Sequence, residues 1–349
     1  MIFPMFSLII PVYNVAPYLR ECLDSVRVQT FTDWECLCVD DGSTDGSSAI
    51  LDEYAESDSR FHVFHQENGG VSSARNLGVD NAQGKWVWFV DADDIIREDA
   101  LLIINKTVQL HPQVQTVFFR FLKGISTPVS WPDNELSSPH VYYSPSDDGI
   151  MQFSGGMCMY AMRRSAIGTL RFERFPRGED TIFLLSYARN GFDLVTIPSH
   201  LYFYRQRQGS AVHSVPTYEM VAQTFDCLQR HVETLIDTLL CLGVPMANRS
   251  WAERFRYCYR SYCGMFFQLC PCERKRLLGR WFSILEMIQR YYRPTLEKRI
   301  RIRMIRITQS GFLVKYLAFG WIPCLKTTCR FLRFSKRLGL KFVQFLKKK

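Results

Sequence analysis

The amino-acid sequence predicts an α/β fold, with a mixed, mainly parallel sheet flanked by helices and a helical C-terminal region after it. Three observations support this prediction. Short apolar runs alternate with helical segments over residues 6–121. Polar clusters directly follow several of these runs, where a parallel sheet would collect its strand ends. From about Pro216 the pattern is helical to the end of the chain.

The first 121 residues contain five apolar runs of strand length, separated by segments with helical spacing of apolar residues. The predicted strands are Phe6–Tyr13, Trp34–Val39, Phe61–His65, Lys85–Val90 and Val117–Phe121. The predicted helices are Pro17–Gln29, Ser47–Ser57, Val71–Asn81 and Asp99–His111. This alternation predicts crossover connections and hence parallel strands.

The following segment is less regular. Residues 122–155 are rich in Pro, Ser and Asp and predict a loop. Further strands are expected at Gly156–Arg163, Leu194–Ile197 and Leu201–Tyr204, with a helix at Asp180–Asn190. We therefore expect a sheet domain over residues 1–215, with halves 5–105 and 106–215, and a helical region over residues 216–349.

Charge is divided unevenly along the chain. The net charge is +9, but residues 273–349 carry +18 and the remainder carries −9. In this basic tail, Lys and Arg interleave with bulky apolar residues at roughly helical spacing, which predicts an interfacial helix on an anionic membrane surface. The alternative is an amphipathic helix packed on the sheet domain. A nucleic-acid partner is not expected, because no recognition motif accompanies the charge.

The twelve cysteines show no paired zinc spacing, and Cys270-Pro271-Cys272 comes nearest to it. We expect them to be reduced and mostly buried. The N-terminal residues lack a basic segment and predict a first strand rather than a signal peptide. No run of 18 uninterrupted apolar residues exists, since Gly311–Leu325 is short and broken by Lys315. No transmembrane helix is therefore predicted.

Asp91 and Asp93 follow the apolar strand residues Trp86–Val90, and Asp94 comes next. Two carboxylates at i and i+2 on a strand end can share a hard cation, and oxygen ligands suit Mg²⁺ or Mn²⁺, which also hold phosphate oxygens. The alternative is a helix cap or a solvated turn. The position after a buried strand favours the metal site.

Two further clusters face the same predicted edge. Asp40 and Asp41 open a Gly-Ser-Thr-Asp-Gly run, where a carboxylate could accept the N3–H of uracil; a tight turn with a helix cap would use the same residues. Gly69–Asn76 opens a helix whose backbone N–H groups, with Arg75, suit a diphosphate. Alternatively, Arg75 only pairs with Asp91 or Asp93.

Four segments in this order, SLIIPVYN, DDGSTDGS, GGVSSARNLG and WFVDADD, resemble the family 2 glycosyltransferases of the GT-A fold. The resemblance covers about residues 5–215 and is strongest over 5–100. It implies a nucleotide-sugar donor and Mn²⁺ or Mg²⁺ as the cofactor. The donor-binding residues that it implies, together with the clusters above, are Pro11, Val12, Tyr13, Asn14, Asp40, Asp41, Asn68, Arg75, Asp91, Arg205 and Arg207.

The resemblance also assigns roles within these segments. Asp41 would meet the base, with Asp40 as the less favoured choice, and Asp93 would bind the metal directly, with Asp91 near the ribose and metal. Glu179-Asp180 resembles the family's Glu-Asp motif, in which one carboxylate is the catalytic base; Asp180 is favoured, and the alternative is a dipole-stabilised helix start. Arg205 and Arg207 would neutralise phosphate, and His213 would be an additional metal ligand.

The resemblance implies an inverting transfer, with a UDP-sugar favoured, to a hydroxyl of a glycan or lipid-linked acceptor in surface-polysaccharide synthesis. The basic tail would place the enzyme at the cytoplasmic membrane face, near such an acceptor. One alternative is a sugar nucleotidyltransferase, which would need a Gly-rich basic signature absent from Phe6–Asn14. Another is a non-catalytic membrane- or polysaccharide-binding protein, which would not need the carboxylates. A P-loop kinase is excluded because the sequence has no GxxxxGK[ST] motif.

Overall fold

Four parallel strands form the first half of the sheet in the computed structural model. They are β1 (Phe6–Val12), β2 (Trp34–Asp40), β3 (Phe61–His65) and β4 (Trp86–Phe89). Their spatial order is β3-β2-β1-β4. All seven β2 residues are buried, which fits a central strand covered on both faces. The four predicted strands are confirmed to within two residues at each end.

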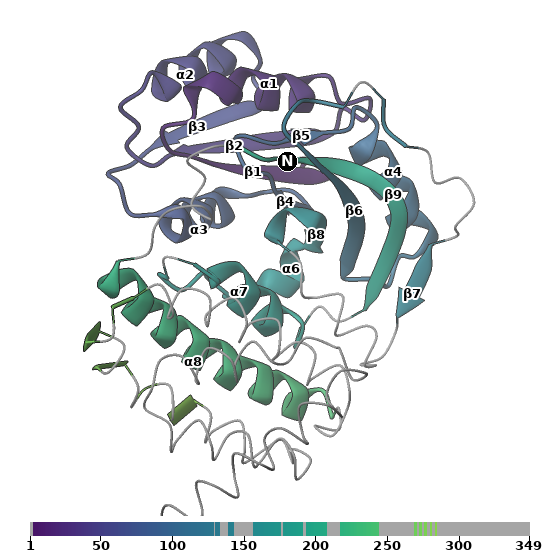
Figure 1. Cartoon of the computed structure of the whole chain (residues 1–349). Helices are drawn as coiled ribbons and strands as arrows, with labels where there is room; N and C mark the ends of the chain where they lie inside the picture. The colour runs from purple at the N-terminus through teal and green to yellow at the C-terminus, as the bar shows by residue number, and fades with distance from the viewer. Residues whose placement is uncertain are drawn as a thin grey trace, which may run out of the picture. The chain divides into compact units, whose positions relative to one another are not determined.

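The helices between these strands cover both faces of the sheet. They are α1 (Ala16–Arg27), α2 (Ser47–Ser57) and α3 (Val71–Asn81). Figure 1 shows α1 and α2 on one side of β1–β3 and α3 on the other. Gly78 of α3 allows close packing on the sheet, because a Cβ there would lie 2.3 Å from a side-chain carbon of Ile9.

The second half of the sheet is mixed. It contains β5 (Ile95–Ile96), β6 (Thr116–Gly124), β7 (His140–Tyr142), β8 (Tyr160–Arg163) and β9 (Leu194–Arg205). Strand β8 runs antiparallel between β4 and β6, and β9 is parallel to β6. The short strands β5 and β7 both pair antiparallel with β9.

Several sequence predictions in this half were wrong in detail. Residues 194–205 form one strand rather than two, with register shifts on either side of Arg120 in its partner β6. The strand expected at Gly156–Arg163 starts later, after the short 3₁₀ helix η1 (Met157–Met159). Strands β5 and β7 lie in segments predicted as turn or loop, because two or three residues are too short to show a periodic pattern.

The remaining helices are α4 (Ala100–Leu110), α6 (Arg164–Ile167), α7 (Glu179–Tyr187) and α8 (Tyr218–Cys241). Helix α8 packs outside α7 (Figure 1), and Thr238 Oγ1 of α8 donates to the Leu185 carbonyl of α7 at 2.9 Å. Within the described part of the chain, no helix is both long and apolar enough to cross a bilayer. The chain divides into two compact units, residues 1–293 and 294–349.

The structure describes the first unit only in part. The second unit and most of the basic tail lie outside the described residues. The described residues are 3–128, 130–132, 139–142, 156–175, 177–190, 193–207, 217–243, 269–270, 272–273, 276–277, 280 and 283–284.

Candidate active site

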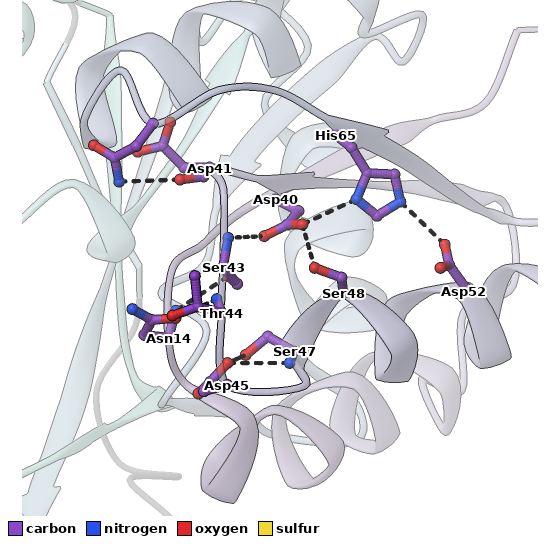
Figure 2. Close-up of polar contacts among 11 residues, drawn as sticks. Asn14, Asp40, Asp41, Ser43, Thr44, Asp45, Ser47, Ser48, Asp52 and His65 are labelled. Atoms are coloured by element: carbon purple, nitrogen blue, oxygen red, sulfur yellow. Dashed lines mark hydrogen bonds and ion pairs between the residues drawn. The ribbon is translucent and has the colours of Figure 1, made fainter.

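The ends of β1 and β2 are joined by hydrogen bonds from Asn14. Its backbone has a φ of 48°, a left-handed conformation that asparagine tolerates better than most residues. The Asn14 Oδ1 accepts from the backbone N–H of Thr44 at 2.7 Å, and the Asn14 N–H donates to Ser43 Oγ at 3.1 Å (Figure 2). These bonds fix the loop after β2 against the loop after β1.

Asp40, the last residue of β2, is buried and fully engaged by donors. One oxygen accepts from the Ser43 N–H at 3.0 Å, and the other lies 2.5 Å from Ser48 Oγ and 2.9 Å from His65 Nδ1 (Figure 2). Burial raises the pKa of Asp40, but the hydrogen bonds outweigh it and the pKa is lowered overall. The other His65 nitrogen lies 3.1 Å from Asp52.

Asp41 holds the loop that leads into α3. Its Oδ1 accepts from Gln66 Nε2 at 2.6 Å and from the Gly69 N–H at 2.8 Å, and its Oδ2 accepts from the Gly70 N–H at 2.9 Å. Asn68 Nδ2 donates to the Asp41 carbonyl at 3.0 Å. The structure thus gives Asp41 and Asn68 a loop-fixing role, and contact with a base stays a prediction.

Asp45 serves two helices at once. Its Oδ2 accepts from the Ala16 N–H at the start of α1 at 3.0 Å. Its Oδ1 accepts from the Ser47 N–H at the start of α2 at 3.1 Å, as Figure 2 shows. Free N–H groups at helix starts favour such a carboxylate. The turn-and-cap alternative therefore describes this part of the motif correctly.

The β1 end lies beside these loops. Val12 is buried, and its carbonyl accepts from the Asp41 N–H at 2.8 Å. Tyr13 is exposed, so its ring is accessible at the edge of the sheet. Pro11 pairs with Val39 in the β1–β2 ladder.

The second acidic cluster follows β4, and its most buried member is Asp94. Its carboxylate accepts from Tyr202 Oη at 2.6 Å and from the Arg205 N–H at 2.7 Å. Burial, with Asp91 and Asp93 nearby, raises the pKa of Asp94 to about 8. Asp94 therefore joins the end of β4 to β9, a role that the sequence did not indicate.

Two arginines from β9 and the residues after it surround Asp93. Arg207 Nε lies 2.5 Å from Asp93 Oδ2, and Arg205 Nε donates to the Asp93 carbonyl at 2.9 Å. Both guanidinium groups lie over the Tyr18 ring of α1, at 5.4 and 5.5 Å from its centre. Arg205 also pairs with Glu21 at 2.5 Å. The predicted arginines thus gather beside the predicted metal ligand.

Arg75 connects the second acidic cluster to α7. Its Nη1 donates to Glu179 at 2.8 Å and its Nη2 to Asp91 at 3.2 Å. The guanidinium is buried over the Phe172 ring, and its Nε has no hydrogen-bond partner in the described part of the chain. The sequence left two roles open for Arg75, a contact with a diphosphate or an ion pair with Asp91 or Asp93. The structure shows the ion pair with Asp91, and the diphosphate contact stays a prediction.

Asp180 lies next to this bridge, in the first turn of α7. Its Oδ1 accepts from the Thr181 N–H at 2.7 Å. Burial and the charge of Glu179 raise the pKa of Asp180 to about 6, although Arg75 acts in the opposite direction. Glu179 is committed to Arg75, whereas Asp180 has a pKa suited to accepting a proton near neutral pH.

The carboxylates after β4 fit a divalent cation held together with a phosphate ligand. The side chains of Asp91 and Asp93 are 34% and 20% exposed, and burial raises the pKa of Asp91, opposed by Arg75. No three metal-ligating side chains converge among the described residues. Mg²⁺ commonly uses one or two carboxylates and takes its other ligands from water and phosphates, so Asp93 and Asp91 are the residues that would hold such an ion.

The structure brings most of the predicted residues to the carboxyl edge of the sheet. His213 lies outside the described residues. Sequence reasoning missed Gln66, His65 and Tyr202, which support the predicted carboxylates. The position of His65 and Gln66 at the end of β3 is a signal that could have found them, whereas Tyr202 lies within β9 and carried none.

Comparisons with known proteins show the family to which the chain is similar. The model for "Glycosyl transferase family 2" matches residues 7–170. The putative teichuronic acid biosynthesis glycosyltransferase TuaG of Bacillus subtilis is 30% identical over 194 residues, covering 54% of this chain and 74% of TuaG. The uncharacterized glycosyltransferase EpsJ of B. subtilis is 33% identical over 216 residues, covering 59% of this chain and 62% of EpsJ.

Glycosyltransferase GlyA of Streptococcus pneumoniae is 34% identical over 257 residues, covering 69% of this chain but only 35% of GlyA. The matched part of this chain therefore spans less than two thirds of EpsJ and about a third of GlyA.

Solved structures show the same fold. The S. aureus TarS fragment in complex with UDP-GlcNAc is 17% identical, with a TM-score of 0.56, covering 81% of this chain and 88% of that one. The mannosyltransferase PcManGT from Pyrobaculum calidifontis, in complex with GDP-Man and Mn²⁺, is 16% identical, with a TM-score of 0.51, covering 91% and 84%. The GT-A fold expected from the sequence is confirmed.

Proposed function

The chain belongs to glycosyl transferase family 2, and we propose that it transfers a sugar from a UDP-sugar to a hydroxyl of a glycan or lipid-linked acceptor, with inversion at the anomeric carbon. The observation that supports this proposal best is the grouping of Asp93, Arg75 and Asp180 at one edge of the sheet. A cation-binding carboxylate, a buried guanidinium and a half-buried carboxyl with a pKa of about 6 are the groups that such a reaction needs.

The donor end is assigned to the loops after β1, β2 and β3. Asn14, Asp40 and Asp41 are fixed there by many short hydrogen bonds, so a nucleoside meets a preorganised surface. Tyr13 is exposed beside them and offers a ring to the base. UDP is favoured because a carboxylate accepts from the uracil N3–H.

The diphosphate is assigned to the region of Asp93, Arg205 and Arg207. A divalent metal bound by Asp93 and Asp91 would stabilise the charge that develops on the leaving diphosphate. Arg207 already pairs with Asp93, and we infer that it turns to the phosphate when the donor binds. His213, six residues later, is proposed as an additional metal ligand.

The acceptor hydroxyl is assigned to Asp180, which takes its proton as the oxygen attacks the anomeric carbon. The C–O bond to the diphosphate breaks as the new glycosidic bond forms, and the proton stays on the Asp180 carboxylate until solvent removes it. Arg75 fixes Glu179 at 2.8 Å and so positions the first turn of α7 that carries Asp180.

The biological role proposed is cell-surface glycan synthesis. TuaG is named for teichuronic acid biosynthesis, and TarS was solved with UDP-GlcNAc; these names support the class of reaction and leave this chain's sugar open. The basic tail, residues 273–349, is proposed to hold the enzyme on the cytoplasmic membrane face near a lipid-linked acceptor.

The test is a donor screen with the full chain. Purified protein is incubated with Mn²⁺ and a panel of UDP-, GDP- and dTDP-sugars, and released nucleoside diphosphate and sugar are measured. We expect UDP release from at least one UDP-sugar, lost in Asp93→Ala. Failure to bind or cleave any nucleotide sugar refutes the proposal, and release of pyrophosphate from a sugar phosphate and a nucleoside triphosphate indicates a nucleotidyltransferase instead.

A further inference from the structure

A tight turn after β4 contains both carboxylates that we assign to the metal. It runs from Asp91 to Asp94. The Asp94 N–H donates to the Asp91 carbonyl at 3.0 Å, which is the hydrogen bond that closes a β-turn. Because Asp91 and Asp93 belong to this turn, the groups that fix its backbone also determine where a cation could bind.

The Tyr202 hydroxyl of β9 contacts both ends of this turn. It accepts from the Asp91 N–H at 3.1 Å and donates to Asp94 Oδ2 at 2.6 Å. A hydroxyl has one proton to donate and lone pairs to accept, so the two bonds use it in both roles. Tyr202 is fully buried, and β9 is paired with β5 and β6. The hydroxyl therefore attaches the turn to a strand that is itself held in the sheet.

We propose that Tyr202 is a positioning residue for the metal: its hydroxyl holds the Asp91–Asp94 turn in the conformation that offers Asp91 and Asp93 to a divalent cation. This role rests on the proposed function, in which those two carboxylates hold the ion. Hydrogen bonds from outside the ligand set commonly orient metal ligands, and the loss of such a partner typically weakens metal binding by about 10–100-fold.

The turn has other attachments, but Tyr202 is the one that can be removed without changing a charge. Arg205 donates to Asp94 Oδ1 through its N–H at 2.7 Å and to the Asp93 carbonyl through Nε at 2.9 Å. Its guanidinium is also proposed to meet the diphosphate, so its replacement would change two functions at once. Cys22 Sγ lies 3.6 Å from the first carbonyl of the turn, and a thiol is only a weak donor.

A simpler explanation is that Tyr202 only satisfies buried polar groups, and Tyr187 of α7 shows what that looks like. Tyr187 is also fully buried. Its hydroxyl donates to the Gln115 carbonyl at 2.6 Å and accepts from Thr116 Oγ1 at 3.4 Å. These bonds join α7 to the start of β6 and include no residue of the turn. The two tyrosines match in burial and in hydroxyl bonding, and they differ in what they hold.

The test compares Tyr202→Phe with Tyr187→Phe in the full chain. Free Mn²⁺ is measured by electron paramagnetic resonance during a titration at saturating UDP, with no sugar donor or acceptor present. We expect Tyr202→Phe to bind Mn²⁺ about 10–100-fold more weakly than the wild type, and Tyr187→Phe to bind it as the wild type does. Urea unfolding checks that both variants fold. Phenylalanine keeps the ring at position 202, whose centre lies 6.4 Å from that of Trp88.

A second variant, Asp94→Asn, tests the same contact from its other end. The amide keeps an oxygen for the Arg205 N–H but offers N–H groups to the Tyr202 hydroxyl, which then lacks an acceptor for its proton. The substitution also alters charge near the metal. That effect is the same in the wild type and in the Tyr202→Phe background, so a double-mutant cycle removes it. Asp94→Asn should therefore weaken Mn²⁺ binding less in the Tyr202→Phe background than in the wild type.

The outcomes separate this role from the proposed function. Equal Mn²⁺ affinity of the wild type and Tyr202→Phe, an equal loss in the two phenylalanine variants, or additive losses in the cycle would overturn the positioning role. The metal assignment would survive each of these results, because the wild type still binds Mn²⁺ with UDP. A wild type that binds no Mn²⁺ at saturating UDP would contradict the metal assignment itself, and the positioning role with it.

Discussion

Replacing Asp180 with asparagine isolates its ability to accept a proton. The asparagine keeps an oxygen for the Thr181 N–H, which donates to Asp180 Oδ1 at 2.7 Å in the wild type, so the first turn of α7 should remain folded. The donor contacts proposed for Asp41, Asp93 and Arg207 are not changed. We therefore expect donor affinity to stay within about threefold and transfer to fall by about 10²–10⁴-fold, the usual contribution of a general base.

The structure also sets the pH dependence of the wild type. Asp180 must be ionised to act as a base, and its pKa is raised to about 6. About nine tenths of the side chain is ionised at pH 7 and about one tenth at pH 5, so kcat/KM should fall by about tenfold between these values. The residual activity of Asp180→Asn should not show this acid limb.

The assay measures initial rates of UDP release at saturating donor over a range of acceptor concentrations, which gives kcat/KM for the acceptor at each pH. Donor affinity is measured separately by calorimetry. Glu179→Gln is the matched control, since it keeps an oxygen for Arg75 and adjoins Asp180. It should lose far less activity than Asp180→Asn. An inactive Glu179→Gln together with an active Asp180→Asn would show that the other carboxylate is the base.

Three further predictions concern the metal, the nucleotide loops and the tail. Asp93→Ala or excess EDTA should abolish donor binding and turnover, measured by calorimetry and UDP release; full activity in either case contradicts the metal assignment. The hydrogen bond with Asp40 raises the pKa of His65 in the folded protein. Protonated His65 therefore stabilises the fold fully below the ordinary histidine pKa, and this stabilisation is lost as the pH rises through the raised pKa of the folded state. His65→Gln should therefore lower the unfolding free energy by about 1 kcal/mol at pH 6 and by less at pH 8. The control is His62→Gln: His62 is equally exposed, at 47%, but its nearest carboxylate, Glu35, is 3.9 Å away, so this variant should not show the pH-dependent loss. Equal pH profiles of the two variants in urea unfolding refute the assignment. Full-length protein should sediment with anionic vesicles in a salt-sensitive way, and a chain cut near Glu273 should not; equal sedimentation ends the membrane hypothesis.

The parallel half of the sheet could be predicted because each strand and helix there has its own periodic pattern. Polar residues follow Val12, Val39 and Phe89, near the ends of three of these strands. Because the carboxyl ends of parallel strands lie at the same edge of a sheet, these polar residues could be predicted to lie together there. This reasoning places residues on an edge and says nothing of which side chains touch. The mixed half was less predictable, because β5 and β7 are defined by their partner β9 rather than by their own residues.

The supporting contacts were unpredictable for a related reason. Arg75 and Glu179 are separated by 104 positions, and Tyr202 and Asp94 by 108, so no local pattern connects them. Asp94 shows the consequence. In the sequence it is the last of three carboxylates in Asp91-Ala92-Asp93-Asp94, whereas in the structure it is hydrogen-bonded to β9 and burial raises its pKa to about 8.

The contacts of Arg75 also bear on the choice between the two carboxylates of the Glu-Asp motif. The sequence alone does not show which of two adjacent carboxylates in a first helical turn acts as the base. Arg75 takes Glu179 into a buried ion pair, and removing a partner from such a pair is costly because a charge is left buried. A residue held this way is poorly placed to change its protonation during each reaction cycle. Asp180 has no such ion pair among the described residues, and its raised pKa lets it gain and lose a proton near neutral pH.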